Sequence, residues 1–134
     1  LDLVKNKTKI QNIIKRFNKL NIRTSLFVNP SLKDIKISKT INADCIEIHT
    51  GKLSNLVKKG KNFSKELKRI KECSFFANDL GIEVHAGHGL DYKTTKILTK
   101  IKEIKEFNIG HFIIGESIFL GLTNVVKKFK TIIK

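Results

Sequence analysis

Short runs of β-forming residues alternate with segments of helical periodicity, and this alternation constrains the fold more than any other feature of the chain. The runs cover residues 22–28, 45–49, 82–86 and 108–114. Each run stops at or near a glycine or an Asn-Pro pair, as strands commonly do. Strands that alternate with helices over short connections are parallel and are joined by right-handed crossovers. We therefore predict one α/β unit over residues 1–134.

Apolar residues recur at helical spacing between these runs. The predicted helices cover residues 10–20 with Asn6 or Thr8 as the cap, a segment that begins at Ser31, and residues 64–80, 97–101 and 118–129. Asp34 lies three residues after Ser31, as in a weak capping box, and Gly81 follows the long helix as a C-terminal stop. The polar segment after Gly51 is interpreted as a loop, in which the lysine-rich residues 58–61 are solvated or draw anions towards the strand ends.

Two architectures fit this order of elements. One is a small doubly wound sheet, and the other is part of a (β/α)₈ TIM barrel. A whole barrel takes roughly 250 residues, whereas this chain has 134. Four strands would be half of a barrel.

The chain is strongly basic, because 27 Lys and Arg residues against 12 Asp and Glu residues give a formal net charge of +15. Such an excess is typical of a nucleic-acid surface, but it also occurs on solvated helix faces. The lysines are spread over almost every predicted helix, and arginine, the better reader of bases, occurs only at Arg16, Arg23 and Arg69. We therefore expect no nucleic-acid partner.

The sequence favours neither a membrane protein nor a secreted one. No run approaches the roughly 18 consecutive apolar residues of a transmembrane helix, and residues 1–7 lack the apolar core of a signal peptide. Cys45 and Cys73 are too few for a disulfide scaffold and are interpreted as packed thiols. We expect a cytoplasmic protein with no membrane partner. Since the sequence contains no Met, we interpret the chain as a piece of something longer.

Alternation along the strands separates an apolar face from a polar one. Ile46 and Ile48 share one face of the second run, whereas Cys45, Glu47 and His49 share the other; Glu83, His85 and Gly87 likewise share a face of the third. The apolar sides should lie beneath helices. Glu47, His49 and His85 should then point into the barrel, where an ionisable group is costly unless it is paired or used.

Histidines gather where the strands end. His49, His85 and His88 lie at or just past strand ends, the edge at which parallel α/β folds bind ligands, while His111 falls inside the last predicted strand. Taken singly, each histidine is also consistent with a structural role. The glycines that flank His88 let a substrate approach the backbone, and its imidazole can exchange a proton near neutral pH. Histidines with Glu47 could also bind a metal, but their spacing is not that of a helical ligand set, and we expect no metal.

Residues 115–117 (Gly-Glu-Ser) end the fourth predicted strand and open the last predicted helix. Backbone N–H groups at such a helix start bind phosphate in many barrels. The signal is weak alone, and Glu116 would disfavour a nearby dianion unless its side chain points away.

Four segments together give the chain a specific resemblance. They are residues 25–27 (Ser-Leu-Phe), 46–51 (Ile-Glu-Ile-His-Thr-Gly), 86–90 (Ala-Gly-His-Gly-Leu) and 108–115 (Asn-Ile-Gly-His-Phe-Ile-Ile-Gly). In order and spacing they resemble the pyridoxine 5′-phosphate synthase family over essentially the whole chain. The resemblance implies a TIM barrel, of which this chain covers strands five to eight and their helices.

The family resemblance implies a reaction and a set of site residues. The family condenses 1-deoxy-D-xylulose 5-phosphate with 3-amino-2-oxopropyl phosphate to pyridoxine 5′-phosphate, phosphate and water, with no cofactor, in cytoplasmic homo-octamers. His88 matches its proton donor, and Glu47 matches a glutamate that stabilises the transition state. Gly89, Gly110 and His111 match groups that bind the aminoketone phosphate. His49 and His85 are interpreted as supporting groups.

The chain also departs from the family. Glu116 stands where the family often has arginine, which leaves only backbone contacts to a phosphate there. The family residues that bind the sugar phosphate and supply further acid–base groups have no counterpart here, so we expect the fragment alone to be inactive. The alternatives are a non-catalytic phosphate-binding half-barrel that needs a partner chain and, third, a basic nucleic-acid module.

Overall fold

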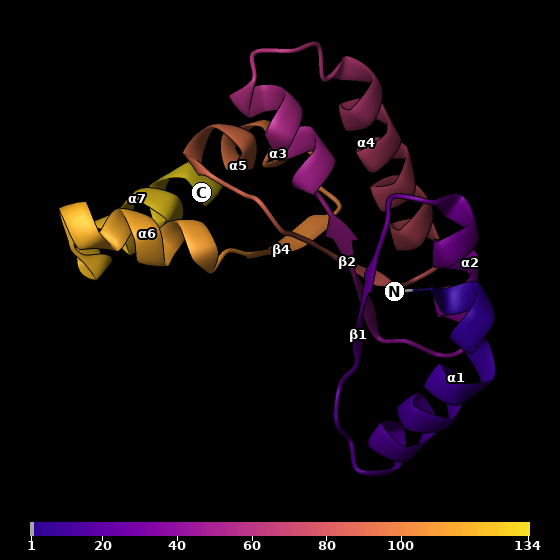
Figure 1. The fold of residues 1–134 in the computed structure, drawn as a ribbon. Coiled ribbons are helices and arrows are strands. Elements are labelled where there is room, and N and C mark those ends of the chain that lie inside the picture. Colours follow the sequence, from indigo (N-terminus) through magenta and orange to yellow (C-terminus); the bar gives the residue numbers. More distant parts are fainter. Residues whose placement is uncertain (1) are drawn as a thin grey trace.

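The computed structural model describes residues 2–134 and shows one four-stranded parallel sheet with helices between its strands (Figure 1). The strands are β1 (Ser25–Val28), β2 (Cys45–His49), β3 (Glu83–Gly87) and β4 (Ile104–Asn108). The helices are α1 (Leu3–Lys19), α2 (Leu32–Thr40), α3 (Gly51–Lys58), α4 (Ser64–Asp79), α5 (Tyr92–Leu98), α6 (His111–Leu120) and α7 (Leu122–Ile133). Leu1, the first residue of the predicted unit, lies outside the described residues.

The strands lie side by side in the order of the sequence, β1-β2-β3-β4. A doubly wound sheet reverses its strand order at a switch point, and this sheet has no reversal. The order is that of consecutive βα units in a TIM barrel. Of the two predicted architectures, the structure is consistent with the partial barrel.

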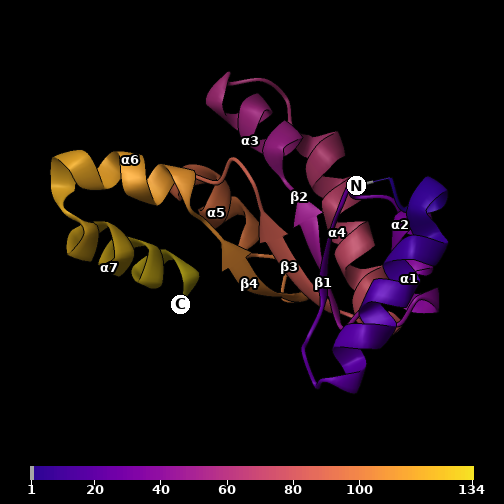
Figure 2. The same cartoon turned by 60° about the horizontal axis from the view of Figure 1, so that its bottom comes forward.

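The predicted separation of the strand faces is confirmed. Ile46, Ile48, Val84 and Ala86 are fully buried on one face, which α2 and α4 cover (Figure 2). The opposite face carries a row of residues in register across all four strands: Phe27, Glu47, His85 and Glu106. The polar side chains therefore share the face that would form the interior of a closed barrel.

Local signals placed several helix ends correctly. The Ser31 side chain caps α2 by accepting a hydrogen bond from the Asp34 N–H at 3.4 Å. Helix α4 spans the predicted segment, and Gly81 follows it with φ of 69°, which favours glycine. Helix α1 begins earlier than predicted, because Asp2, and not Asn6 or Thr8, supplies the cap.

The fourth strand was predicted in the wrong place. Strand β4 covers Ile104–Asn108, and residues 111–114 form the start of α6, so His111 is the first residue of a helix. A short apolar run such as residues 112–114 suits a buried strand or a helix equally well by periodicity. The pairing of Ile104 with Val84 on β3 selects the earlier segment.

Other predicted boundaries also differ from those of the structure. The segment after Gly51 forms α3 and not a loop, because Leu53 and Ser54 are buried in its first turns. Gly121, with φ of 77°, divides the predicted last helix into α6 and α7. Strand β1 starts at Ser25 and not at residue 22, and α5 ends at Leu98.

Among the described residues, 2–134, no strand pairs with the outer edge of β1 or with that of β4. The α6–α7 hairpin extends away from the sheet (Figure 1) and exposes large apolar side chains, with Ile118 79% and Phe119 83% exposed. Within residues 2–134, no helix combines the length and apolar character needed to cross a membrane.

Candidate functional site

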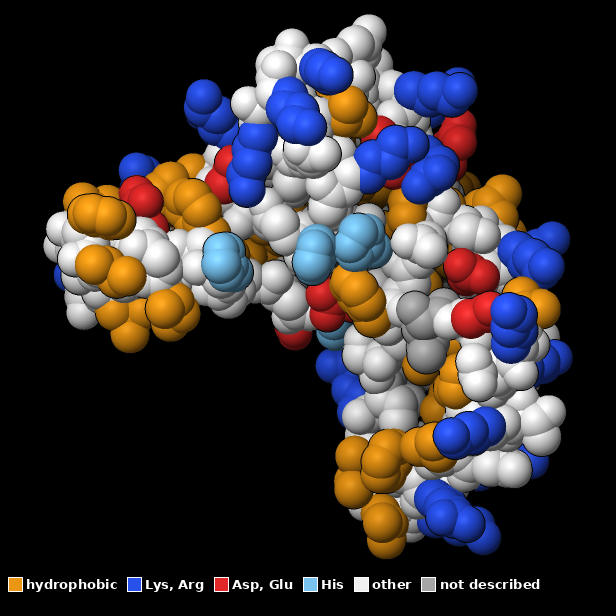
Figure 3. All heavy atoms as spheres, viewed as in Figure 1, with side chains coloured by type: hydrophobic (Ala, Val, Ile, Leu, Met, Phe, Trp, Pro, Cys, Tyr) orange, Lys and Arg blue, Asp and Glu red, His pale blue; other side chains and the backbone are white. Residues whose placement is uncertain are grey.

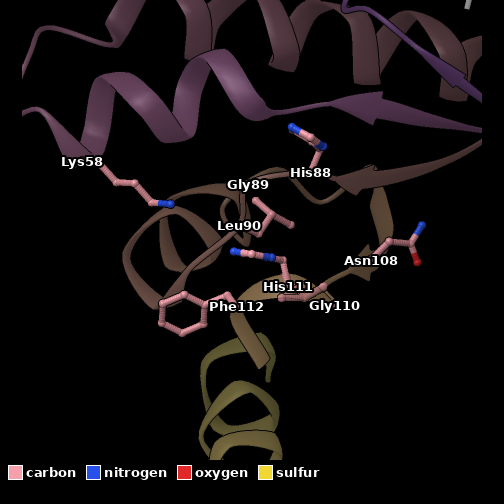
Figure 4. Close-up of a pocket in the computed structure, with 9 residues that line it drawn as sticks. Lys58, His88, Gly89, Leu90, Asn108, Gly110, His111 and Phe112 are labelled. Atoms are coloured by element: carbon pink, nitrogen blue, oxygen red, sulfur yellow. The ribbon is translucent and has the colours of Figure 1, made fainter. Parts of the chain in front are cut away.

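A pocket of about 330 Å³ lies at the carboxyl edge of the sheet (Figure 4). It is lined by Lys58, His88, Gly89, Leu90, Asn108, Ile109, Gly110, His111 and Phe112. These residues come from the end of α3, from the loop after β3 and from the stretch between the last residue of β4 and the start of α6. Four predicted site residues, His88, Gly89, Gly110 and His111, thus line one pocket although they span 24 positions of the sequence.

The loop after β3 is held in a left-handed conformation. His88 and Gly89 both have φ of 75°, which is uncommon for a residue with a side chain. Thr50, at the end of β2, fixes this loop: its N–H donates to the Gly87 carbonyl at 2.9 Å, and its hydroxyl lies 2.7 and 2.8 Å from the Gly87 and His88 carbonyl oxygens. A strained residue persists where its surroundings determine it, as at functional sites.

The ring of His88 stacks on His49. Their centroids lie 4.6 Å apart, and Phe27 meets the His49 ring edge-on at 5.2 Å. In Figure 4 the His88 ring points towards the end of β2. Figure 3 shows histidine side chains gathered at the centre of this face, with basic side chains above them. Burial lowers the pKa of His49, and the neighbouring His88 lowers it further.

Glu47 lies one row deeper in the sheet than the pocket. Its carboxylate accepts a hydrogen bond of 2.7 Å from the side-chain amide of Asn108. Asn108 itself lines the pocket. Glu47 therefore does not line the pocket but is joined to its wall through Asn108.

Helix α6 starts at the pocket with free backbone donors. The first helical hydrogen bond runs from the Ile114 N–H to the Gly110 carbonyl, so the N–H groups of residues 111–113 precede the helical ladder. The first turn has no acidic residue, and Gly110 makes no side-chain cap. Lys58 reaches towards the same pocket from α3 (Figure 4). This arrangement suits an anion.

The phosphate contact expected at residues 115–117 does not occur at a helix start. These residues lie inside α6, one turn beyond its first residues. The helix start at Gly110 and His111 is the position that offers free N–H groups. The prediction was wrong because the strand before it was placed too late in the sequence.

His85 lies away from the pocket, in the row below. Its Nε2 lies 2.8 Å from a Glu83 carboxylate oxygen, its Nδ1 lies 3.7 Å from Glu106, and Glu83 also pairs with Arg23. The hydrogen bond with His85 and the pairing with Arg23 lower the pKa of Glu83. Of the two predicted supporting histidines, His49 therefore contacts the pocket residues and His85 belongs to a separate ionic cluster.

Sequence reasoning missed Asn108 and Thr50. Asn108 was placed at the beginning of a strand, although it ends one, so its position at the carboxyl edge was hidden. Thr50 follows a predicted strand directly, and that location could have marked it. No group of three or more His, Cys, Asp or Glu among residues 2–134 is arranged to hold a metal ion.

The parallel sheet in sequential order, with a pocket lined by His88 and His111 at its carboxyl edge, defines an α/β protein consistent with part of a TIM barrel. A family model described as pyridoxal phosphate biosynthesis protein PdxJ matches residues 1–134. The chain belongs to this family.

Curated relatives agree with this membership. The chain is 64% identical over 132 residues to the pyridoxine 5′-phosphate synthase of Pelagibacter ubique (strain HTCC1062), covering 98% of this chain and 55% of that protein. It is 46% identical over 133 residues to the synthase of a Sulfurihydrogenibium species, covering 99% of this chain and 54% of the relative. It is 41% identical over 133 residues to the synthase of Prochlorococcus marinus (strain MIT 9312), with 99% and 55% covered. The chain spans about half the length of these relatives.

Proposed function

We propose that this chain forms the C-terminal half, strands five to eight, of a pyridoxine 5′-phosphate synthase. The complete barrel condenses 1-deoxy-D-xylulose 5-phosphate with 3-amino-2-oxopropyl phosphate, giving pyridoxine 5′-phosphate, phosphate and water. The observation that carries the proposal is the convergence of His88, Gly89, Gly110 and His111 on one pocket.

The pocket binds the phosphate of 3-amino-2-oxopropyl phosphate in this proposal. Gly89 presents bare backbone, and Gly110 and His111 lie at the start of α6 with its free N–H groups. Such a helix start stabilises an anion through both its donors and its dipole. Lys58 adds a positive charge at the rim.

His88 acts as the proton donor, and Glu47 stabilises the transition state. The left-handed loop presents His88 to the pocket while Thr50 prevents it from relaxing. An imidazole so placed can protonate a departing hydroxyl as water leaves. The Glu47 carboxylate, held towards the same strand end, stabilises positive charge that develops on the substrate nitrogen.

Activity requires the part of the barrel that the relatives have beyond the matched region. We propose that the fragment alone is inactive and that the complete protein assembles as a cytoplasmic homo-octamer, as the family resemblance implies. The unpaired edges β1 and β4 also favour the alternative of a non-catalytic half-barrel that binds a partner chain.

The test is reconstitution. This chain is co-expressed with the part of the Pelagibacter ubique synthase that it does not match, and pyridoxine 5′-phosphate formation is followed by chromatography. We expect turnover in the complex, and a loss on the order of 100-fold or more in His88→Ala and in Glu47→Gln. A stable complex without turnover would favour the non-catalytic alternative, and full activity in either variant would remove that residue's role.

A second test uses the chain alone. Inorganic phosphate is added while amide chemical shifts are followed by NMR. We expect shifts at Gly89, Gly110 and His111. Shifts confined to surface lysines would contradict the phosphate site.

A further inference from the structure

We propose that Asn108 is the positioning residue of Glu47: its side-chain amide holds the carboxylate across β3 and ties it to the strand that leads into the phosphate pocket. The contact is the 2.7 Å hydrogen bond from Asn108 Nδ2 to Glu47 Oε2, between residues 61 positions apart. The catalytic consequence of this contact rests on the proposed synthase function.

Within the described part of the chain, the Glu47 carboxylate has no side-chain hydrogen bond or ion pair besides the one from Asn108. Its register neighbours are Phe27 on β1, which has no polar group, and His85 on β3, which is engaged by Glu83 and Glu106. Without Asn108 the Glu47 side chain would keep several rotamers open on the exposed face of the sheet. The hydrogen bond therefore selects the orientation of the carboxylate.

The path of the Glu47 side chain depends on Gly87. The register places Gly87 beside His49 on one side and Asn108 on the other, so Gly87 lies between the strands that carry the two partners. A Cβ atom at position 87 would lie 1.9 Å from Glu47 Oε1 and 3.2 Å from the Asn108 Cβ. The carboxylate thus crosses β3 over a residue that must lack a side chain.

Asn108 holds the oriented carboxylate beside the proposed phosphate site. It lines the pocket and lies two residues before Gly110, where the phosphate-binding helix begins. One short segment therefore carries the partner of the carboxylate at Asn108 and the start of the anion-binding helix at Gly110 and His111. Such an arrangement suits a substrate that carries an amino group and a phosphate a few bonds apart, with the nitrogen directed to Glu47.

The test compares Asn108→Leu and Asn108→Asp with Asn78→Asp in the reconstituted complex. Asn78 is exposed on α4, so it controls for an added charge. We expect both Asn108 variants to lower kcat on the order of 100-fold, while the KM for 3-amino-2-oxopropyl phosphate and the phosphate-induced shifts stay near wild type. An unchanged kcat, or equal losses of kcat and phosphate binding, would overturn the proposal.

The two variants are expected to differ in their pH profiles. In Asn108→Asp two carboxylates face each other and share a proton at low pH, which restores a donor to Glu47. Its kcat relative to wild type should therefore rise as pH falls, whereas that of Asn108→Leu should not. The other titratable groups near this position are common to both variants: Lys58, His88 and His111 line the pocket with Asn108, His49 stacks on His88, and His85 is the register neighbour of Glu47. Parallel profiles would count against the hydrogen bond.

A structural measurement separates this proposal from the proposed function. Crystal structures of the wild-type chain and of Asn108→Leu are compared at Glu47, with Gly87→Ala as a second variant that blocks the same path. We expect the carboxylate to leave its position over residue 87 in both variants. If the wild-type complex lacks turnover, the synthase function fails while this comparison still decides the positioning role; an unmoved Glu47 in Asn108→Leu would overturn it.

Discussion

His49 and His88 stack with their ring planes 30° apart, above a glycine that leaves no room for any other residue. A Cβ atom at Gly51 would lie 2.7 Å from His88 Cδ2 and 2.9 Å from His49 Cε1. The pair thus depends on three elements: the end of β2, the start of α3 and the loop after β3. Because the two rings are in contact, we expect a substitution of either histidine to change the environment of the other.

Replacing His88 should raise the pKa of His49. Burial and the nearby His88 both lower that pKa from its ordinary value of 6.5, and His88→Asn removes the second cause. We expect histidine NMR titrations to show His49 protonating at higher pH in the variant. His111→Asn, which leaves the stacked pair intact, is the matched control; an equal shift in that variant would contradict the direct coupling.

The lowered pKa of His49 also predicts a pH dependence of stability. The unfolded chain takes up the His49 proton near pH 6.5, whereas the folded chain takes it up only at lower pH. The contribution of His49 is therefore neutral above pH 6.5 and destabilising as pH falls below it. Urea unfolding between pH 8 and 5 should show a smaller loss of unfolding free energy in His49→Asn than in the wild type. The same pH dependence of the unfolding free energy in both proteins would refute the lowered pKa of His49.

Two glycine substitutions should change stability in opposite directions. Gly51→Ala places a methyl group against both rings, and we expect a loss of about 1–3 kcal/mol in the free energy of unfolding. Gly115→Ala adds a methyl group to α6 where nothing lies within 4 Å, and we expect a gain of about 0.5–1 kcal/mol. Thermal or urea unfolding measures both. An unchanged free energy of unfolding in Gly51→Ala would mean that the two rings stack less tightly in solution.

Both cysteines should resist thiol reagents in the folded chain. Cys45 and Cys73 are each 2% exposed, and burial raises the pKa of Cys73 to about 11. The protonated thiol is a poor nucleophile at pH 8. We expect labelling by a chromogenic disulfide reagent to be slow in buffer and complete in denaturant. Rapid labelling of one thiol before unfolding would show a local opening around it.

The strand–helix alternation was enough to predict the fold class, because parallel strands covered by helices appear in the sequence as apolar runs. It was not enough for the last quarter of the chain. The run after Gly110 is apolar without a clear period, so only pairing with β3 could show that the strand ends at Asn108. The same ambiguity hid the break at Gly121.

The candidate site was predicted in part. The family resemblance and the strand-end rule together selected His88, Gly89, Gly110 and His111, which the pocket brings together, while their roles stay predictions. The partners that hold them could not be read from spacing. Asn108 on β4 reaches Glu47 on β2 because Gly87, on the intervening strand β3, has no side chain. Such a contact depends on strand register.

The sequential strand order has a consequence for how the chain reaches this structure. Each strand pairs only with its immediate neighbours along the sequence, so every pairing closes a loop of modest length and no pairing has to wait for a distant segment. Loop-closure entropy rises with the separation of paired segments, so this order keeps that cost small for a parallel sheet. The pairings among these four strands therefore depend on no segment outside this half of the barrel.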